Sequence, residues 1–300
     1  MSRKIIYIVN PISGTKGKQS LQALIEKRTT AQGIPYFIYP SVANGDYSFL
    51  HDIIKEEKIT DVVAAGGDGT VSQVIHSLQP TGVNFGIIPC GSGNSLALAT
   101  GIPKAPTKAL QTIFAGKADK VDAFTVNDYF SCMLCGIGFD AKVAHDFAKQ
   151  PTRGLAMYVK QSALNFFAAK SYAFEMAFDK QKIKVDAYFV SIANSNQFGN
   201  NVTIAPRANL SDGLLDIVIV TKQNKVNFVL QTLRQVTGFN SLQTARPIDT
   251  NRAVIYFQTD KIKVTNKDNA PLHIDGEPLE TATVFDIHVK KNFFTLIQPA

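Results

Sequence analysis

The stretch DVVAAGGDGTVSQVIHSL, residues 61–78, decides the fold. Residues 61–65 are typical of a buried strand, and the apolar spacing from about Val71 to Leu78 predicts a helix. Between them stands Gly66-Gly67-Asp68-Gly69-Thr70, called the glycine pentad below. Glycines let a backbone approach phosphate oxygens, and a helix N-terminus adds free N–H donors. We therefore expect a phosphate site at this strand-to-helix turn, where Thr70 either caps the helix or bonds a phosphate.

Asp68 is an unusual member of a phosphate-binding loop, because its carboxylate would repel the ligand. The side chain is better suited to holding Mg²⁺ or a ribose, or to reaching the reacting centre. A tight turn without any ligand would explain the Gly66-Gly67 pair alone, whereas all five residues of the pentad in this context favour a function.

The same strand–loop–helix unit recurs on both sides of the pentad. Small-residue loops follow two further strands, namely Asn10-Pro11-Ile12-Ser13-Gly14 and Pro89-Cys90-Gly91-Ser92-Gly93-Asn94-Ser95. Strands are expected at 4–10, 35–39 and 85–88, and helices at about 19–32, at 47–58 and from about residue 94 onward. This alternation predicts a parallel, doubly wound sheet, whose ligands bind at the carboxyl ends of the strands. The spacing of a P-loop is absent, and so is G-x-G-x-x-G in the first loop.

Beyond Val121 the pattern changes to one of short strands. They are expected at 123–134, 172–178, 182–193, 214–220, 253–257, 261–264, 283–289 and 293–297, with helices at about 154–169 and 225–236. Such a pattern predicts an antiparallel β-sandwich. The predicted fold class is thus α/β plus all-β, with a doubly wound nucleotide domain at 1–122, a β-sandwich domain at 123–290 and the active site in the cleft between them.

Composition limits the choice of partners without selecting one. The chain has 31 Lys and Arg against 24 Asp and Glu, a net charge of +7, which favours anionic partners but is explained as well by solubility. The sequence contains no motif of interleaved aromatic and basic residues of the kind that binds RNA. The longest charge-free segment, 81–103, contains repeated Gly and Pro, which argues against a membrane-spanning helix. Three cysteines fit a reducing cytoplasm, and Cys132 and Cys135 are expected to be buried in a strand.

Two acidic segments in the second half have residue types suited to phosphoryl transfer. His273-Ile274-Asp275-Gly276-Glu277 holds two carboxylates, of which one could accept a hydroxyl proton and the other hold Mg²⁺. A hairpin corner with solvated acids explains this segment equally well. Ser211-Asp212-Gly213-Leu214-Leu215-Asp216 contains a turn that could bind a hard cation, or be an ordinary Asp-Gly turn.

Taken together, these segments resemble the diacylglycerol kinase catalytic-domain family, which includes bacterial diacylglycerol and lipid kinases and sphingosine kinases. The resemblance covers nearly the whole chain. It rests on motifs in the family's order, namely Asn10-Pro11-x-Ser13-Gly14, the pentad, Pro89 to Asn94, Gly136-x-Gly138-Phe139-Asp140-Ala141, Asp212-Gly213-x-Leu215-Asp216 and Asp275-Gly276-Glu277. It implies a kinase that uses ATP and Mg²⁺ to phosphorylate a lipid hydroxyl of the diacylglycerol or sphingoid base class.

The resemblance also implies a set of site residues. The catalytic residues would be Asp275, Glu277 and Asp68. Asp275 would be the base and Glu277 the magnesium partner, and the opposite assignment of these two roles is also open. A structural Mg²⁺ loop would use Asp212 and the backbones of Asn209 and Leu214, joined by Asp122. The final strand, about 291–300, would return to the first domain. Nucleotide contacts would fall on Asn10, Pro11, Ser13, Gly14, Ser41, Gly66, Gly67, Asp68, Gly69, Thr70, Val71, Ser72, Gly91, Ser92 and Asn94.

Departures from the family pattern leave the acceptor open. Ser72-Gln73 stands where the family commonly has Asn-Glu, and residues 91–95 look more like sphingosine kinases. Two alternatives therefore remain: an NAD kinase-like enzyme with a soluble acceptor, and a catalytically inactive lipid- or nucleotide-binding protein. The expected location is cytoplasmic and peripheral to the membrane, with a lipid partner and no nucleic acid, and a homodimer is left open. The basic segment 142–170 would either face anionic lipid or be a packed helix with solvated lysines.

Overall fold

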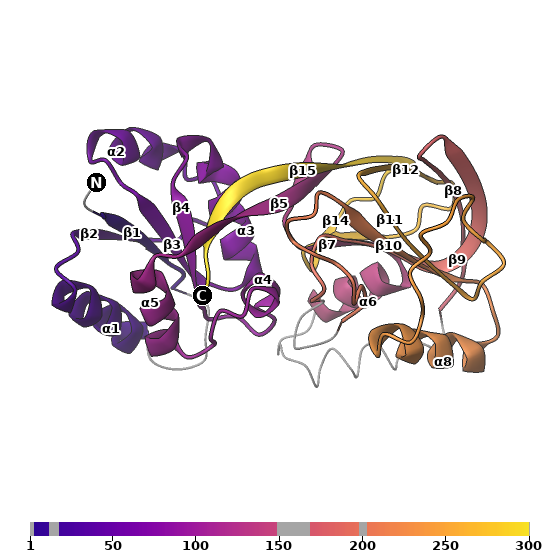
Figure 1. The fold of residues 1–300 in the computed structure, drawn as a ribbon, viewed down its shortest axis with the longest axis horizontal. Coiled ribbons are helices and arrows are strands. Elements are labelled where there is room, and N and C mark those ends of the chain that lie inside the picture. Colours follow the sequence, from indigo (N-terminus) through magenta and orange to yellow (C-terminus); the bar gives the residue numbers. More distant parts are fainter. Residues whose placement is uncertain (1–2, 12–17, 149–168, 198–202, 300) are drawn as a thin grey trace. The chain divides into compact units, whose positions relative to one another are not determined.

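The chain divides into two compact units, drawn in Figure 1. The computed structural model describes residues 3–11, 18–148, 169–197 and 203–299. Unit 1 comprises Met1–Val121 and Asn292–Ala300, and unit 2 comprises Asp122–Lys291. The helix predicted at 154–169 lies outside the described residues apart from Ala169, and most of the basic segment 142–170 does too.

Unit 1 is built on a parallel sheet. Its strands lie in the order β2 (Tyr36–Pro40), β1 (Ile5–Val9), β3 (Asp61–Gly66), β4 (Asn84–Pro89), followed by the end of β15 (Val284–Ile297). All these neighbours pair in parallel, and β15 joins through Thr295 and Leu296 opposite Asn84 and Phe85. Strands β1 and β3 are almost wholly buried, as expected for a sheet that is covered on both faces.

Helices cover this sheet in two groups. One contains α1 (Lys18–Ala31) and α5 (Pro106–Ala115), which pack against each other; the other contains α2 (His51–Glu56) and α3 (Asp68–Leu78), which pack with the short 3-10 turns η1 (Ser48–Leu50) and η2 (Gln79–Thr81). A further short helix, α4 (Ser95–Ala99), follows β4. Figure 1 shows helices on either side of the strands. The predicted doubly wound α/β class is confirmed.

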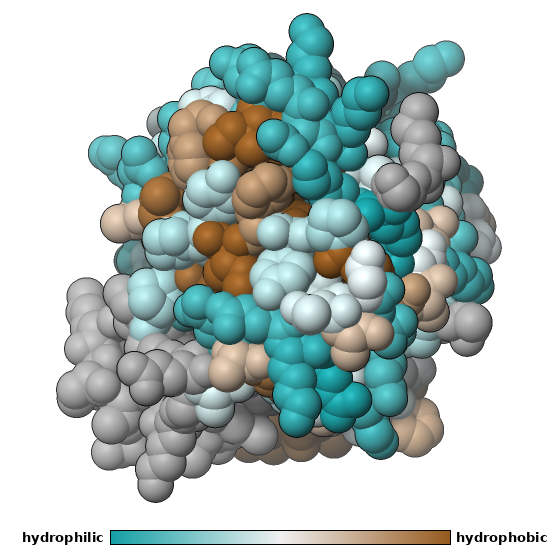
Figure 2. Space-filling view, turned by 90° about the vertical axis from the view of Figure 1, so that its left-hand side faces the viewer, coloured by the Kyte–Doolittle hydropathy of each residue, from teal (hydrophilic) through white to brown (hydrophobic). Residues whose placement is uncertain are grey.

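Strand β2 forms the outer edge of the unit 1 sheet, because only β1 pairs with it. Aromatic side chains gather there: Phe49, half exposed at 50%, lies edge-on to Tyr39 and beside Tyr47. Figure 2 faces this side of unit 1 and shows hydrophobic areas separated by hydrophilic residues. Interspersed polar side chains are one way in which an exposed sheet edge avoids pairing with other chains.

Unit 2 is a β-sandwich whose two sheets share one long strand, β9 (Gln181–Ala193). Residues 181–187 of β9 pair with β8, and residues 189–193 pair with β7 and β10. Ala187 belongs to both sheets, because it also pairs with Thr221 of β10 beyond a register shift. In the first sheet, β10 and β11 follow β9 on one side, and β7, β13 and β14 follow it on the other. In the second sheet, β9 is followed by β8, β12, β15, β5 and β6. The bounds are β5 Ala118–Val126, β6 Tyr129–Ser131, β7 Leu134–Gly138, β8 Tyr172–Phe178, β10 Leu215–Thr221, β11 Val254–Thr259, β12 Lys261–Asn266, β13 Leu272–Ile274 and β14 Glu277–Leu279. The predicted sandwich is confirmed.

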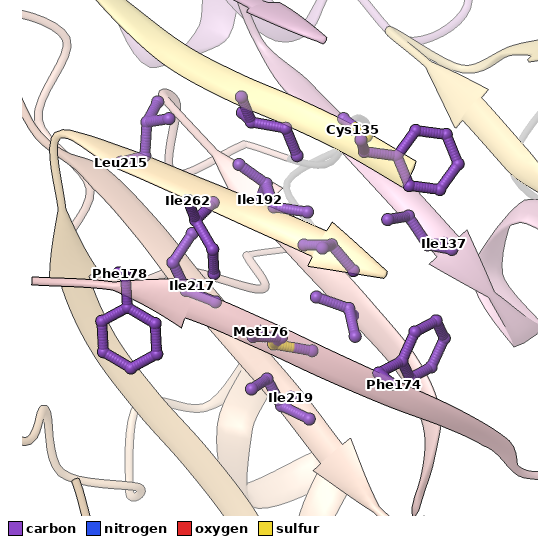
Figure 3. Close-up of a cluster of buried hydrophobic side chains, with 14 of the residues drawn as sticks. Cys135, Ile137, Phe174, Met176, Phe178, Ile192, Leu215, Ile217, Ile219 and Ile262 are labelled. Carbon is purple, nitrogen blue, oxygen red and sulfur yellow. The ribbon is translucent and has the colours of Figure 1, made fainter. Parts of the chain in front are cut away.

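The core of unit 2 lies between these sheets, and Figure 3 shows part of it. Strand β8 alternates strictly between buried and half-buried residues, so Phe174, Met176 and Phe178 all point into the core. Phe178 stacks on Phe257 with 4.3 Å between ring centroids. Cys135 belongs to the same cluster, and burial raises the pKa of its thiol well above the ordinary value. The prediction of a buried, structural Cys135 is therefore confirmed.

Two strand predictions were wrong in a way that matters for the site. The run 123–134 was expected to be one strand, but it contains the end of β5, β6 and the start of β7, with a turn at Asn127 whose φ is +51°. The runs 283–289 and 293–297 were expected to be two strands, but they form the single strand β15. Asn292, also left-handed with φ +51°, lies at the change from unit 2 to unit 1.

Two helices complete unit 2, α6 (Phe139–Ala148) and α8 (Lys225–Val236). The bounds predicted for α8 are confirmed, and residues 142–148, the part of the expected helical stretch 142–170 that lies in a described helix, belong to α6. Phe228 of α8 packs on the outer face of β9 by stacking on Tyr188, with 4.3 Å between the ring centroids. Among the described residues, no helix is long and apolar enough to cross a membrane.

A buried carboxyl, Asp216 in β10, makes the stability of unit 2 sensitive to pH. It accepts hydrogen bonds from the Tyr256 hydroxyl and, at 2.9 Å, from Nε2 of Gln258. Burial raises the pKa of Asp216 from 3.8 to about 6, and hydrogen bonding only partly offsets this. A raised pKa in the folded state means that the native protein holds a proton which the unfolded chain has already released. The contribution of Asp216 to stability is therefore present below about pH 4 and is lost as the pH rises through about 6.

We expect Asp216→Asn to remove this pH dependence. Relative to the wild type, the variant should gain free energy of unfolding on the order of 3 kcal/mol between pH 4 and pH 7, because one pKa unit corresponds to about 1.4 kcal/mol. Urea unfolding of both proteins across this range measures the difference, and Asp260→Asn, at an exposed position, is the control. A difference that stays constant with pH would contradict the prediction.

Candidate active site

The described loops that were predicted to bind a nucleotide meet at one edge of the unit 1 sheet. Since β1, β3 and β4 are parallel neighbours, their carboxyl ends lie side by side. The Asn10 N–H donates to the Ala65 carbonyl at 2.9 Å, and the Cys90 N–H donates to the Gly66 carbonyl at 2.9 Å. The three loops are therefore tied to one another by backbone hydrogen bonds where the strands end.

Ser41 lies at the same edge, because its N–H donates to the Val9 carbonyl at 3.0 Å directly after β2. Ser41 thus shares an edge with the other described contacts, and the nucleotide contact predicted for it stays a prediction. Ser13 and Gly14, two further predicted contacts, lie outside the described residues.

The helix after the pentad begins at Asp68, three residues before the predicted start, with Gly67 as its N-cap. Thr70 consequently lies inside the first turn, where it is buried and accepts a hydrogen bond from Nδ2 of Asn10 at 2.8 Å. Of the two roles expected for Thr70, capping the helix is therefore wrong, and bonding a phosphate stays a prediction. A Cβ at Gly66 would lie 2.7 Å from the Cβ of Thr70, so the turn closes only with glycine at this position.

The pentad and the second glycine loop touch through their backbones. A Cβ at Gly91 would lie 2.6 Å from the Cα of Gly67, closer than real side chains approach. The second loop is closed by Asn94, a left-handed residue with φ +52°. Its Oδ1 accepts from the Gly91 N–H at 2.9 Å, and its Nδ2 donates to the Gly91 carbonyl at 2.7 Å. Both ends of the Asn94 amide thus hold the loop in shape.

Asp68 links the same two loops through its carboxylate. Its Oδ1 accepts from the N–H of Ser95, the first residue of α4, at 2.6 Å. Negative charge is favourable at the N-terminus of a helix, so this contact stabilises the start of α4. A Cβ at Gly93 would lie 2.7 Å from Oδ2 of Asp68, which explains the small residue there. Asp68 therefore has a bracing role that the sequence did not indicate.

In unit 2, Asp275 and Gly276 form a two-residue turn between β13 and β14. Both are left-handed, with φ +49° and +84°, as the tightest hairpins require. The Asp275 carboxylate accepts from four donors: the Ser131 hydroxyl at 2.7 Å and the backbone N–H groups of Cys132, Met133 and Leu134 at 3.3, 3.2 and 3.1 Å. The segment from β6 to β7 is thus a cradle for this one carboxylate.

Glu277, the other member of the acidic pair, has a different environment. It is exposed at the start of β14, whereas Asp275 is half-buried. The two carboxylates therefore differ in availability: Asp275 is held by the backbone of a neighbouring strand, and Glu277 faces solvent.

A buried pair, Asp140 and His273, lies beside this turn. Oδ2 of Asp140 and Nε2 of His273 are 3.6 Å apart, and Nδ1 of His273 accepts from the Gly276 N–H at 3.3 Å. A Cβ at Gly136 would lie 2.1 Å from the Asp140 oxygen and 2.3 Å from the His273 nitrogen. The glycine in the Gly136-x-Gly138-Phe139-Asp140 motif therefore makes room for the pair that supports the acidic turn.

The predicted metal loop brings two carboxylates together. Oδ2 of Asp122 accepts from the Gly213 N–H at 2.7 Å, and Oδ1 of Asp212 accepts from the Leu214 N–H at 3.0 Å. Burial raises the pKa of Asp212, and the charge of Asp122 raises it further. The described residues contain no group of three His, Cys, Asp or Glu side chains that could hold a metal. A cation here would depend on two acids and on backbone carbonyls such as those of Asn209 and Leu214, a donor set that suits Mg²⁺ or Ca²⁺.

We expect millimolar Mg²⁺ without nucleotide to raise the melting temperature of the wild type by a few degrees, because a ligand that binds only the folded state stabilises it. The Asp212 carboxylate, whose pKa is raised by burial and by the neighbouring charge of Asp122, should be stabilised by a cation. Asp212→Asn should abolish the increase, while Asp128→Asn, at an exposed turn, should keep it. An equal increase in all three proteins in a thermal-shift titration would exclude this loop as the binding site.

Comparison with known proteins agrees with the two-unit architecture. Residues 4–126 match the family model described as the diacylglycerol kinase catalytic domain, and residues 134–294 match the YegS C-terminal NAD kinase beta sandwich-like domain. The chain belongs to the diacylglycerol kinase catalytic-domain family. Its membership in a family of lipid kinases accounts for the order of the motifs along the chain.

Relatives of this lipid kinase family cover most of the chain. A Bacillus subtilis protein named "Diacylglycerol kinase" is 26% identical over 91% of this chain and 89% of its own length. A Pectobacterium atrosepticum protein named "Probable lipid kinase YegS-like" is 30% identical over 77% of this chain and 76% of its own. A Synechocystis protein is 32% identical over 74% of this chain, which spans only 51% of that relative. The crystal structure of a diacylglycerol kinase from Bacillus anthracis shares the fold, with a TM-score of 0.74 at 19% identity over 99% of this chain and 97% of that one.

Proposed function

We propose that this protein transfers the γ-phosphate of ATP to the hydroxyl group of a lipid, either a diacylglycerol or a sphingoid base. The proposal rests on two features that occur together in this member of the lipid kinase family. One is the edge of the unit 1 sheet where glycines line the ends of the strands, and the other is the acidic turn of unit 2, which backbone N–H groups anchor. Phosphoryl transfer depends on positioned phosphates and on a group that accepts the hydroxyl proton. The two sets of residues supply these two requirements.

The nucleotide half of the reaction falls to the loops of unit 1. Gly67 and Gly91 lack side chains at the point where the two loops touch, so backbone N–H groups can approach the phosphates. The N-terminus of α3 begins at Asp68 and adds a favourable dipole. Mg²⁺, when bound with the nucleotide, would offset charge on the phosphate oxygens. Asp68 is a residue suited to hold it, because it carries a carboxylate at this edge.

The acceptor half falls to the acidic turn, where we assign proton acceptance to Glu277. As the lipid oxygen bonds to the γ-phosphorus and the bond to the β-phosphate oxygen breaks, the hydroxyl proton passes to the Glu277 carboxylate. Asp275 anchors the turn, because its two oxygens already accept from four donors. This reverses the first assignment from the sequence, which gave the base role to Asp275.

The test is a transfer assay with γ-labelled ATP and Mg²⁺, offering a diacylglycerol, a sphingoid base and NAD in separate reactions. Label in the organic phase with either lipid, absent without enzyme, is the expected result. Label that enters only NAD would replace the proposal with a soluble-acceptor kinase. Binding of ATP without transfer to any acceptor would indicate an inactive binding protein on the same fold.

A further inference from the structure

We infer that the outer face of α8 is the surface by which this protein docks on an anionic lipid bilayer. The inference rests on the proposed function, since a kinase of long-chain lipids must reach its acceptor at a membrane. It goes further by naming the surface that makes the contact, and it is argued below from the exposure, spacing and charge of residues in unit 2.

The outer face of α8 is apolar and exposed. Four residues at helical spacing, i, i+3, i+4 and i+7, form it: Val226 is 81% exposed, Val229 40%, Leu230 51% and Leu233 57%. Eight large apolar side chains are conspicuously exposed among the described residues, and four of them belong to this stripe. Soluble monomers rarely place such residues together, and apolar surface gathered in one place marks an interaction site.

The opposite face of the helix is already satisfied by the fold. Phe228 is 2% exposed and packs on Tyr188 and on Phe139 of α6, with ring centroids 4.3 and 5.5 Å apart. Gln235 is fully buried and donates to the Ile204 carbonyl at 2.8 Å. Folding of unit 2 therefore accounts for one side of α8 and leaves the apolar outer face unexplained.

A fifth exposed apolar side chain follows just past the end of this helix. After the last helical residue, Val236, the chain forms a Schellman motif at Gly238, which has φ +78°. The Gly238 N–H donates to the Gln235 carbonyl at 3.0 Å, and the Phe239 N–H donates to the Arg234 carbonyl at 2.8 Å. The motif fixes Phe239 just past the helix end, where its ring is 74% exposed. An aromatic ring held in solvent by a fixed turn is suited to the boundary between headgroups and acyl chains.

The charges around α8 select a bilayer over a protein partner. From Ile217 to Ile248 the sequence holds four basic residues and no Asp or Glu. Lys222 and Arg234 are exposed, and within the described ranges neither forms an ion pair. At about 100° per residue, Arg234 falls on a flank of the apolar stripe, where a long cationic side chain can reach lipid phosphates. In a symmetric dimer, a second copy of this chain would bring the cations of one α8 against those of the other.

Flotation of the protein with vesicles, without ATP, tests the inference independently of catalysis. The wild type should bind vesicles of phosphatidylglycerol and phosphatidylcholine, bind pure phosphatidylcholine more weakly and lose binding at high salt. The double variant Leu230→Asp/Leu233→Asp should partition at least about tenfold more weakly, with an unchanged melting temperature because both side chains are exposed. Phe49→Asp, an equally exposed aromatic in unit 1, is the matched control and should bind as the wild type does.

Several outcomes would overturn the inference. One is that the wild type does not bind anionic vesicles, and another is that the double variant binds them as well as the wild type does. A third is that the wild type is a dimer and the double variant is a monomer. In the last case the face would join two copies of the chain. A protein that binds vesicles through α8 yet transfers no phosphate would refute the proposed function and leave the docking surface standing.

Discussion

Glu277→Gln should lower the rate of phosphate transfer by at least about 10²-fold, the usual contribution of a positioned general base. The side chain is exposed and starts a short strand, so its replacement by the isosteric amide removes the proton acceptor and little else. The melting temperature and the affinity for ATP should match those of the wild type. Transfer rates with saturating ATP and lipid, together with thermal unfolding, provide the measurement.

Asp275→Asn should lose both activity and stability, which distinguishes it from Glu277→Gln. The amide nitrogen of asparagine is a donor, and it would face one of the four donors that now point at the carboxylate. A buried donor left without an acceptor costs about 1–3 kcal/mol. Glu280→Gln, an exposed acid that follows β14, is the control for both variants. Full activity in Glu277→Gln, with loss confined to Asp275→Asn, would return the base role to Asp275.

Gly91→Ala should weaken ATP binding at least about tenfold and lower the stability of unit 1. The new methyl group would lie 2.6 Å from the Cα of Gly67, and backbone on both sides leaves nothing flexible to give way. The two loops must separate, which displaces the N–H groups that we expect to face the phosphates. Calorimetric titration with ATP and thermal unfolding measure the two effects.

Gly82→Ala is the control for this substitution. Gly82 has φ +75° and open space where its Cβ would be, so alanine there costs about 1 kcal/mol of backbone strain without touching any loop. Its ATP affinity should equal that of the wild type. If Gly91→Ala also bound ATP normally, the second glycine loop would have no part in the nucleotide site.

The sequence predicts those features that depend on neighbours along the chain. The buried strands 61–66 and 172–178 and helix 225–236 follow from local apolar spacing, and the structure has them close to their predicted bounds. The start of α3 was misplaced because glycines argue against a helix interior, yet Asp68 to Thr70 form its first turn. The break of 123–134 was missed because Asn127-Asp128 is a weak turn signal inside an apolar run.

The partners of the site residues could not be predicted, because they depend on residues distant in the sequence. The donors to Asp275 lie more than 140 residues earlier, in a backbone whose side chains carry no sign of that task. Asp68 meets Ser95 across two loops, and nothing in either residue type announces the contact. The sequence proposed Asp68, Asp275 and Glu277 as the acids of the site, and the fold distinguishes the two that accept hydrogen bonds from distant residues from Glu277, which is exposed.

Strand β15 determines when, during synthesis, the sheet of unit 1 can be completed. Inside unit 1, β4 is paired on one side by β3 and on the other by Thr295 and Leu296, and Phe294 packs edge-on against Phe85. A ribosome that has translated only the first 121 residues has therefore released a sheet with an open edge at β4, a template for wrong pairing. The segment that closes this edge is translated only after all of residues 122–291. Of these two units, unit 1 is thus begun first and finished last, and a ribosome stalled just before residue 292 would leave unit 1, and not the sandwich, incomplete.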